Sequence, residues 1–140
     1  MEPTILTRNN KKRGLITRSI YFRTLAIPCL NYYYYEIFYK DKKKVIPNNL
    51  DKLLTARGLV YWIMDDGGKS VYNQTIIHTR CFSKEEVIYI QSVLNKNFEL
   101  RTRIEEKTKD QWIIYIPVRQ KMRLKDIVRP YMHKSMSYKI

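Results

Sequence analysis

Residues 58–67, Gly58-Leu-Val-Tyr-Trp-Ile-Met-Asp-Asp-Gly67, decide the fold of this chain, because an apolar run of helical length ends there on two carboxylates. Thr55 is a suitable N-cap for such a helix, which we expect to run to about Met64. The helix would then end where Gly67, followed by Gly68, can adopt a positive φ. The stretch predicts a buried helix that presents an acidic group at its C-terminal end.

The overall charge narrows the class of partner. The 140-residue chain carries 27 Lys and Arg against 13 Asp and Glu, a formal net charge of +14, and such a field attracts polyanions. Membrane surfaces and acidic proteins are attracted as well, but charge and tyrosine content together favour nucleic acid. With 44% hydrophobic residues the chain can build a core, and no apolar run approaches the roughly 20 residues of a membrane span. We therefore expect a soluble globular domain.

The two cysteines, Cys29 and Cys81, are unclustered. Their number and spacing argue against a disulfide framework and against a zinc site, and a reducing compartment is the simpler interpretation. We expect both to be small packing residues.

The N-terminal part begins with a basic segment. Residues 1–14, which include Lys12 and Arg13, predict an extended arm that is either a solvated or targeting tail or a phosphate-binding segment. Residues 15–27 are rich in Ile, Thr, Tyr and Phe and predict a strand that Pro28 ends.

A turn divides the chain into two units. Residues 31–39 predict a short helix, and its consecutive tyrosines, residues 32–35, point in different directions. They would serve either core and interface packing or base stacking. Residues 45–49, Val-Ile-Pro-Asn-Asn, predict the turn that ends this unit and begins the next. We expect residues 15–43 and 44–140 to be the two units.

The second unit alternates helices with hairpins. After the opening helix, residues 69–82 predict a hairpin, and Ser83 caps a second helix. That helix has acidic residues in its first turn and an apolar stripe formed by Val87, Ile90 and Leu94. Residues 100–118 predict a second hairpin and residues 120–128 a basic helix. This order predicts an α+β layer, with helices behind one antiparallel sheet whose other face is open.

Several stretches in this order resemble the LAGLIDADG homing endonuclease family, in particular the second half of its monomeric, intron-encoded mitochondrial members. The likeness extends over residues 44–139. The stretches are Lys44-Val-Ile-Pro-Asn-Asn49, residues 59–69, Thr79-Arg-Cys-Phe82 before a helix with Glu85 and Glu86, Ile113-Ile-Tyr-Ile116, Val128-Arg-Pro-Tyr131 and Met136-Ser-Tyr-Lys139.

The resemblance implies an αββαββα unit whose saddle-shaped sheet lies along a DNA major groove. In the family, two motif helices pack beneath the sheet, and each delivers one carboxylate to a divalent metal, which for phosphodiester hydrolysis suits Mg²⁺. By this resemblance Asp66 is the metal ligand and catalytic acid, and Asp65 caps the helix or orients the site. Lys44 and Lys139 fall on the positions of catalytic-site lysines that polarise solvent or stabilise phosphate charge.

Three departures from the family pattern bear on function. Arg80 stands where the family often has a glutamine, and a guanidinium binds phosphate but accepts no hydrogen bond. Val60 and Tyr61 replace small residues at the helix crossing. Only one motif helix is present, while residues 15–43 resemble the end of a first repeat. The resemblance then implies a second chain that supplies the other motif helix.

Side chains of one parity on the predicted hairpins are the candidates for nucleic-acid contact. Arg and Gln side chains there could read base edges, although a solvated sheet face is the alternative. With the motif lysine and the N-terminal arm, the candidates are Lys69, Gln74, His78, Arg80, Arg101, Arg103, Lys12 and Arg13.

Three functions are consistent with these features. The first is a site-specific DNA endonuclease that forms one part of a split or paired enzyme. The second is a noncatalytic RNA-binding protein derived from such an enzyme, as an intron maturase or an organelle ribosome component. The third is a DNA-binding regulator. For each, the resemblance implies a mitochondrial, organelle-encoded protein.

Overall fold

The centre of the molecule is a four-stranded antiparallel sheet with strand order β5-β6-β8-β7. The computed structural model describes residues 2–10, 14–23 and 25–140. Two hairpins make the sheet, β5 (Gly67–Lys69) with β6 (Thr75–His78) and β7 (Arg103–Thr108) with β8 (Gln111–Ile116). The helices of this unit are α1 (Leu50–Leu53), α2 (Ala56–Asp66), α3 (Lys84–Phe98) and α4 (Lys121–Val128). The predicted α+β class and the αββαββα order are confirmed.

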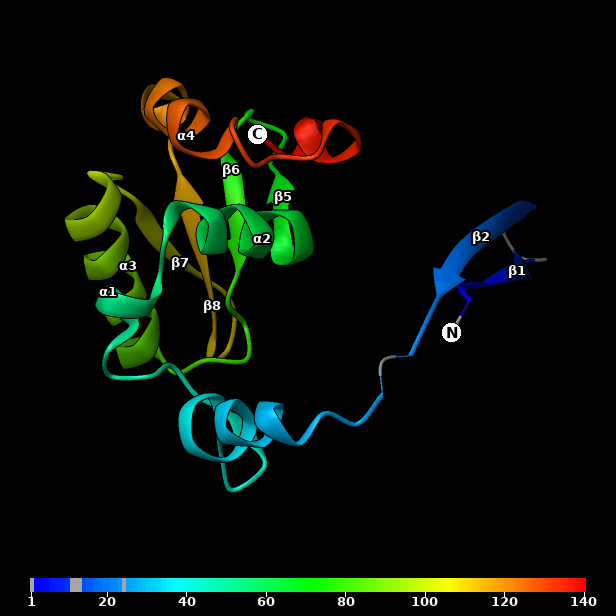
Figure 1. The fold of residues 1–140 in the computed structure, drawn as a ribbon. Helices are drawn as coiled ribbons and strands as arrows, with labels where there is room; N and C mark the ends of the chain where they lie inside the picture. Colours follow the sequence, from blue (N-terminus) through cyan, green and yellow to red (C-terminus); the bar gives the residue numbers. More distant parts are fainter. Residues whose placement is uncertain (1, 11–13, 24) are drawn as a thin grey trace.

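The helices cover one face of the sheet (Figure 1). In register, Ile77 of β6 pairs with Ile114 of β8, which in turn pairs with Ile104 of β7. Ile77 and Ile114 are fully buried against α2 and its neighbours, together with Leu59 and Ile63 of α2. Alternation along each strand sends the next residues to the opposite, open face.

Helix α2 starts as predicted and ends differently. The Thr55 hydroxyl accepts a hydrogen bond from the Gly58 amide at 3.1 Å, which caps the first turn. At the other end the helix continues to Asp66, and Gly67 has a φ of −82°, so the predicted positive φ is wrong. A glycine is needed here for space, because a Cβ at residue 67 would lie 2.2 Å from the Ile63 carbonyl oxygen.

Helix α3 has the predicted N-terminus and the predicted core face. Ser83 and Glu86 form a reciprocal capping box, in which each side chain accepts a hydrogen bond from the other residue's backbone. The three predicted stripe residues, Val87, Ile90 and Leu94, are fully buried.

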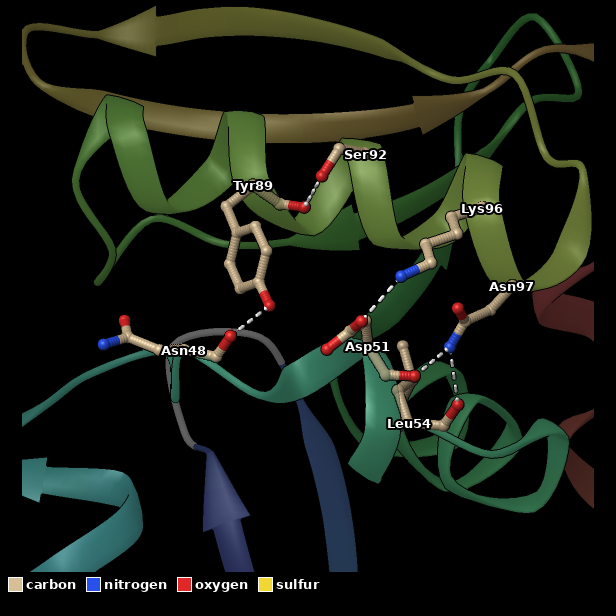
Figure 2. Close-up of polar contacts among 7 residues, drawn as sticks. All are labelled: Asn48, Asp51, Leu54, Tyr89, Ser92, Lys96 and Asn97. Carbon is tan, nitrogen blue, oxygen red and sulfur yellow. Dashed lines mark hydrogen bonds and ion pairs between the residues drawn. The ribbon is translucent and has the colours of Figure 1, made fainter.

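Polar contacts attach the segment before α2 to the outer side of α3 (Figure 2). The Tyr89 hydroxyl donates to the Asn48 carbonyl at 2.6 Å, and the Lys96 ammonium lies 2.7 Å from the Asp51 carboxylate. Asn97 donates to the backbone carbonyls of Asp51 at 2.7 Å and of Leu54 at 3.2 Å. These contacts hold α1 against α3 and so define where α2 begins.

The N-terminal part is more regular than an extended arm and less buried than a core unit. β1 (Thr4–Asn10) and β2 (Leu15–Tyr21) form an antiparallel hairpin, so the predicted strand over 15–27 ends early, at Tyr21. The predicted helix is a π-helix, η2 (Tyr33–Phe38), preceded by the 3-10 turn η1 (Pro28–Leu30). Short strands β3 (Tyr39–Lys40) and β4 (Lys43–Lys44) follow.

The tyrosines of residues 32–35 and the two cysteines are more exposed than the sequence predicted. Tyr32, Tyr33, Tyr34 and Tyr35 are all exposed, so they are not core residues of this chain. Cys29 and Cys81 are free and exposed, so the expectation that they are packing residues is wrong. None of the helices in the described part of the chain is long and apolar enough to cross a membrane.

Candidate active site and nucleic-acid surface

Asp66 is the last residue of α2, and its side chain is exposed. The chain passes directly from this residue into β5, whose first residue, Gly67, pairs with Ile77. The acid therefore lies at the junction of a buried helix and an edge strand of the sheet. A carboxylate held in this way can reach a group that lies against the sheet's open face.

Lys44 lies at the rim of the same hollow as Asp66. This open hollow of about 480 Å³ has a mostly apolar lining that includes Trp62 and Phe82, and it also includes Lys44 and Asp66. The segment that carries Lys44 is held by Glu86, whose carboxylate accepts a hydrogen bond from the Ile46 amide at 2.8 Å. The capping box of α3 thus also positions the lysine.

Lys139 has a different environment from Lys44. Its side chain belongs to the C-terminal 3-10 helix η4 (Lys134–Lys139) and is only 8% exposed. The ammonium donates to the Met64 carbonyl at 2.6 Å and to the Asp65 carbonyl at 3.1 Å. These carbonyls belong to the last turn of α2, where a cation is favourable because the helix dipole is negative there. Lys139 caps the helix that carries Asp66.

Asp66 is the candidate metal ligand in the described residues. The exposed Asp66 offers hard oxygen atoms of the type that Mg²⁺ prefers. In the residues that the structure describes, no three His, Cys, Asp or Glu side chains gather in a way that could hold a metal ion. Mg²⁺ commonly takes one or two carboxylates and completes its shell with water and substrate oxygens. Asp66 fits that pattern as one ligand, and a second carboxylate would come from outside these residues.

His78 lies on the open face near the acid. Ile76 and His78 share one side of β6, opposite Tyr115 and Ile113 of β8. A Cβ at Gly68 would lie 3.4 Å from the His78 Nε2 atom, so the imidazole rests over that glycine. Burial and the positive charge of Arg80 lower the pKa of His78, while Asp66 acts in the opposite sense. The net effect favours the neutral form of the imidazole.

Two basic side chains flank Tyr115 on the open face. Arg103 pairs with Tyr115 in register, and its guanidinium lies 5.5 Å from the ring centroid. The Lys107 ammonium lies 5.3 Å from the same ring, and its pKa is raised mainly by hydrogen bonding with Tyr115 and also by Glu105. Glu105 also pairs with Arg103 at 2.7 Å. Lys107 was missed in the sequence, although it shares the parity of Arg103.

The other predicted contact residues occupy several different places. Arg80 is exposed just beyond β6, and Gln74 lies at the end of the β5–β6 turn, where its backbone N–H donates to the Ser70 hydroxyl at 3.1 Å. Arg101 precedes β7 and lines a hollow against α3. Lys69 pairs with buried Thr75 and so lies on the helix side of β5, away from His78. Lys12 and Arg13 are outside the described residues.

The model of the LAGLIDADG DNA endonuclease family matches residues 1–124. The chain belongs to this family. It is 42% identical over 112 residues to the intron-encoded endonuclease ai4 of Dictyostelium discoideum, a match that covers 77% of this chain and 69% of that protein. It is 35% identical to the cytochrome b mRNA maturase bI2 of Saccharomyces cerevisiae over 99% of this chain and 34% of the maturase.

A solved structure agrees with the fold. The homing endonuclease I-WcaI bound to its DNA recognition sequence matches with a TM-score of 0.77 and 36% identity, over 99% of this chain and 63% of that one. A probable intron-encoded endonuclease of Wickerhamomyces canadensis is 35% identical over 99% of this chain and 62% of its own length. The chain thus spans less than two thirds of both proteins.

Val60 and Tyr61 of α2, which replace the small residues of the family motif, differ in their exposure. Val60 is fully buried in the core of this chain, so its size does not affect a helix docking from outside. Tyr61 is 63% exposed, so its side chain is available to a neighbouring surface. Of the two residues, only Tyr61 is exposed.

Proposed function

We propose that this chain provides one half of a two-helix endonuclease centre that cleaves phosphodiesters of a specific DNA site. The observation that carries the proposal is the exposed carboxylate of Asp66, at the point where a buried helix meets an edge strand of the sheet. Lys44 beside the same hollow supplies a cation near a scissile phosphate. The I-WcaI structure, whose protein is bound to its recognition sequence, supports DNA as the ligand.

Each side chain would have a separate role in this centre. Arg103 and Lys107 would contact DNA from the open face, and Arg80 would bind a phosphate close to the acid. Lys44 would stabilise charge that develops on the phosphate. Lys139 would keep the end of α2 in place and thus act through Asp66 as a positioning residue.

A divalent metal such as Mg²⁺ would be held by Asp66 together with a carboxylate from a second motif helix. When bound, it activates water and neutralises phosphate charge. The second helix would dock beside Tyr61, from another part of a longer protein, a separate chain or a second copy of this one. The relatives that are intron-encoded endonucleases and maturases support an organelle, mitochondrial origin.

Cleavage of DNA tests the proposal. Purified chain, alone and with a candidate partner that carries a second motif helix, is incubated with plasmid libraries of target sites in Mg²⁺. We expect nicking or cutting that Asp66→Asn reduces by at least two orders of magnitude and Asp126→Asn, an exposed acid on α4, does not. Cutting that survives Asp66→Asn would contradict the assignment of the acid.

A second candidate function is noncatalytic RNA binding in intron splicing. It is favoured by the yeast maturase, which matches over almost the whole of this chain. It predicts tight, salt-dependent RNA binding that Asp66→Asn leaves unchanged, with no cutting under any condition. Co-sedimentation with ribosomal particles would extend the same function to an organelle ribosome.

A further inference from the structure

Three lysines gather at the edge of the sheet, on the side away from the open face. Lys69 ends β5, which is an edge strand, and it lies on the same side as buried Thr75. Lys121 begins α4, and Lys125 follows one turn later on the same helix face. The three residues, here called the edge lysines, therefore come from two elements that are about fifty positions apart in the sequence.

A hydrogen bond fixes the centre of this group. The Lys121 ammonium donates to the Asn73 side-chain oxygen at 2.8 Å. Asn73 lies in the β5–β6 turn with a φ of +61°, a conformation that asparagine tolerates well. The first turn of α4 is thereby tied to the turn that follows Lys69, and the lysines meet at that junction.

The edge lysines have like charges beside them. Burial lowers the pKa of Lys121, and the positive charges of Lys69 and Lys125, which repel its ammonium, lower it further. The ion pairs found in the described parts of the chain join other residues, and the nearby Arg123 is paired with Glu99 at 2.9 Å. An anion that bound here would remove this repulsion, and its binding would be favoured for that reason.

We propose that the edge lysines bind phosphates of a nucleic-acid backbone that runs outside β5, separate from the open face of the sheet. Lysine suits this ligand, because a flexible ammonium pairs with phosphate as a point charge without reading base edges. The phosphates come either from the flank of a duplex that lies on the open face or from a separate RNA strand. The site does not depend on cleavage or on Asp66.

Binding at several salt concentrations tests this site. Fluorescence anisotropy with the full chain compares a labelled duplex DNA with a single-stranded RNA of equal length. The test variant is Lys69→Gln/Lys121→Gln/Lys125→Gln, and the matched control is Lys40→Gln/Lys52→Gln/Lys134→Gln, which removes the same charge from exposed, scattered sites. Each lost phosphate contact lowers the slope of log affinity against log salt by about 0.9 for duplex DNA and about 0.7 for single strands.

We expect the test variant to lose about 2 to 3 units of this slope, clearly more than the control. A loss seen with duplex identifies the flank of DNA as the ligand, and a loss seen only with RNA identifies a separate RNA strand. Equal slopes for test and control variants in both titrations would overturn the proposal. If the triple variant unfolds, Lys69→Gln and Lys125→Gln, both exposed, are each expected to lower the slope by about 0.7 to 0.9.

One further variant separates this site from the proposed function. Arg103→Gln removes a cation from the open face, so it weakens duplex binding there whether or not the edge lysines bind phosphate. If Arg103→Gln has no effect while the edge variant does, DNA binding by the open face is wrong and the edge site stands. The reverse result removes the edge site alone.

Discussion

The last turn of α2 shows how single residues place the acid. Gly67 allows the strand to leave the helix without a clash, and Lys139 satisfies the carbonyls that the helix end leaves free. Neither residue needs to touch a substrate for this role. A lysine that the family resemblance places among the catalytic groups thus has, in this chain, all its observed hydrogen bonds with the helix end.

The close approach at Gly67 predicts a large effect of a single methyl group. Gly67→Ala would bring its Cβ to 2.2 Å from backbone oxygen, so we expect a loss of about 1–3 kcal/mol in the free energy of unfolding. Gly58→Ala is the control, because its Cβ would meet ordinary contacts at 3.6 Å and alanine favours a helix by up to about 1 kcal/mol. Urea unfolding of both variants measures the difference. Similar midpoints would contradict the steric account.

At the scale of elements, α3 organises the site although it contributes no predicted site residue. Its capping-box residue Glu86 holds the segment that carries Lys44. Its outer side holds α1, because Lys96 and Asn97 of α3 both bind Asp51. The start of α2 and the position of Lys44 therefore both depend on α3. Changes on α3 that break these contacts are expected to disturb the site from a distance.

The ion pair between Asp51 of α1 and Lys96 of α3 predicts that the wild type and a variant without the pair differ in stability by an amount that depends on pH. Hydrogen bonding and charge from Lys96 lower the pKa of Asp51, and Asp51 in turn raises the pKa of Lys96. Because its pKa is lowered, Asp51 contributes to folding stability at pH values above its usual pKa of about 3.9. This contribution is lost as the pH falls through the lower pKa of the folded state. Because its pKa is raised, Lys96 contributes to folding stability at pH values below its usual pKa of about 10.4. This contribution is lost as the pH rises through the higher pKa of the folded state.

Thermal unfolding of the wild type and Asp51→Asn across this pH range measures the effect. We expect a constant difference between pH 5 and 9 that shrinks toward both extremes and also shrinks with added salt, since both side chains reach solvent. A difference that persists unchanged at strongly acid pH would show that the pair contributes through packing and not through charge.

At the scale of the whole molecule, the N-terminal part and the main unit differ in burial. In residues 2–43, as far as they are described, no side chain is buried, and large apolar residues such as Ile16, Ile20 and Leu25 are 67%, 72% and 74% exposed. So much exposed apolar surface is typical of a segment that contacts another protein surface. The N-terminal part therefore offers apolar surface to another protein surface.

A truncated chain tests this division. We expect residues 44–140 to unfold cooperatively, with a free energy within about 1 kcal/mol of that of the full chain, because the deleted part adds little buried apolar area. Circular dichroism and urea titration of both proteins measure this. A truncated chain that is molten would show that the N-terminal part contributes to the core.

Elements with strong local signals were predictable from the sequence, and long-range neighbours were not. Thr55 and Ser83 were correct as helix caps, because capping depends on residues three positions apart. The N-terminal predictions failed in detail: a π-helix replaced an ordinary helix, and the strand ended at Tyr21. Only weak local preferences act in that segment, where no core defines the register.

The sequence alone determined the order of helices and hairpins, since periodicity and motif spacing are local properties of the chain. Its resemblance to the LAGLIDADG family indicated the family, and it predicted Asp66 as the acid. The tertiary structure decided where each basic residue lies. It placed Lys44 on the same hollow as Asp66, turned Lys139 inward onto α2 and separated Lys69 from Arg103. The physical reason is that a charged side chain interacts with the groups that the fold brings close to it. Strand register and helix packing decide which groups these are, and both depend on contacts between residues far apart in the sequence.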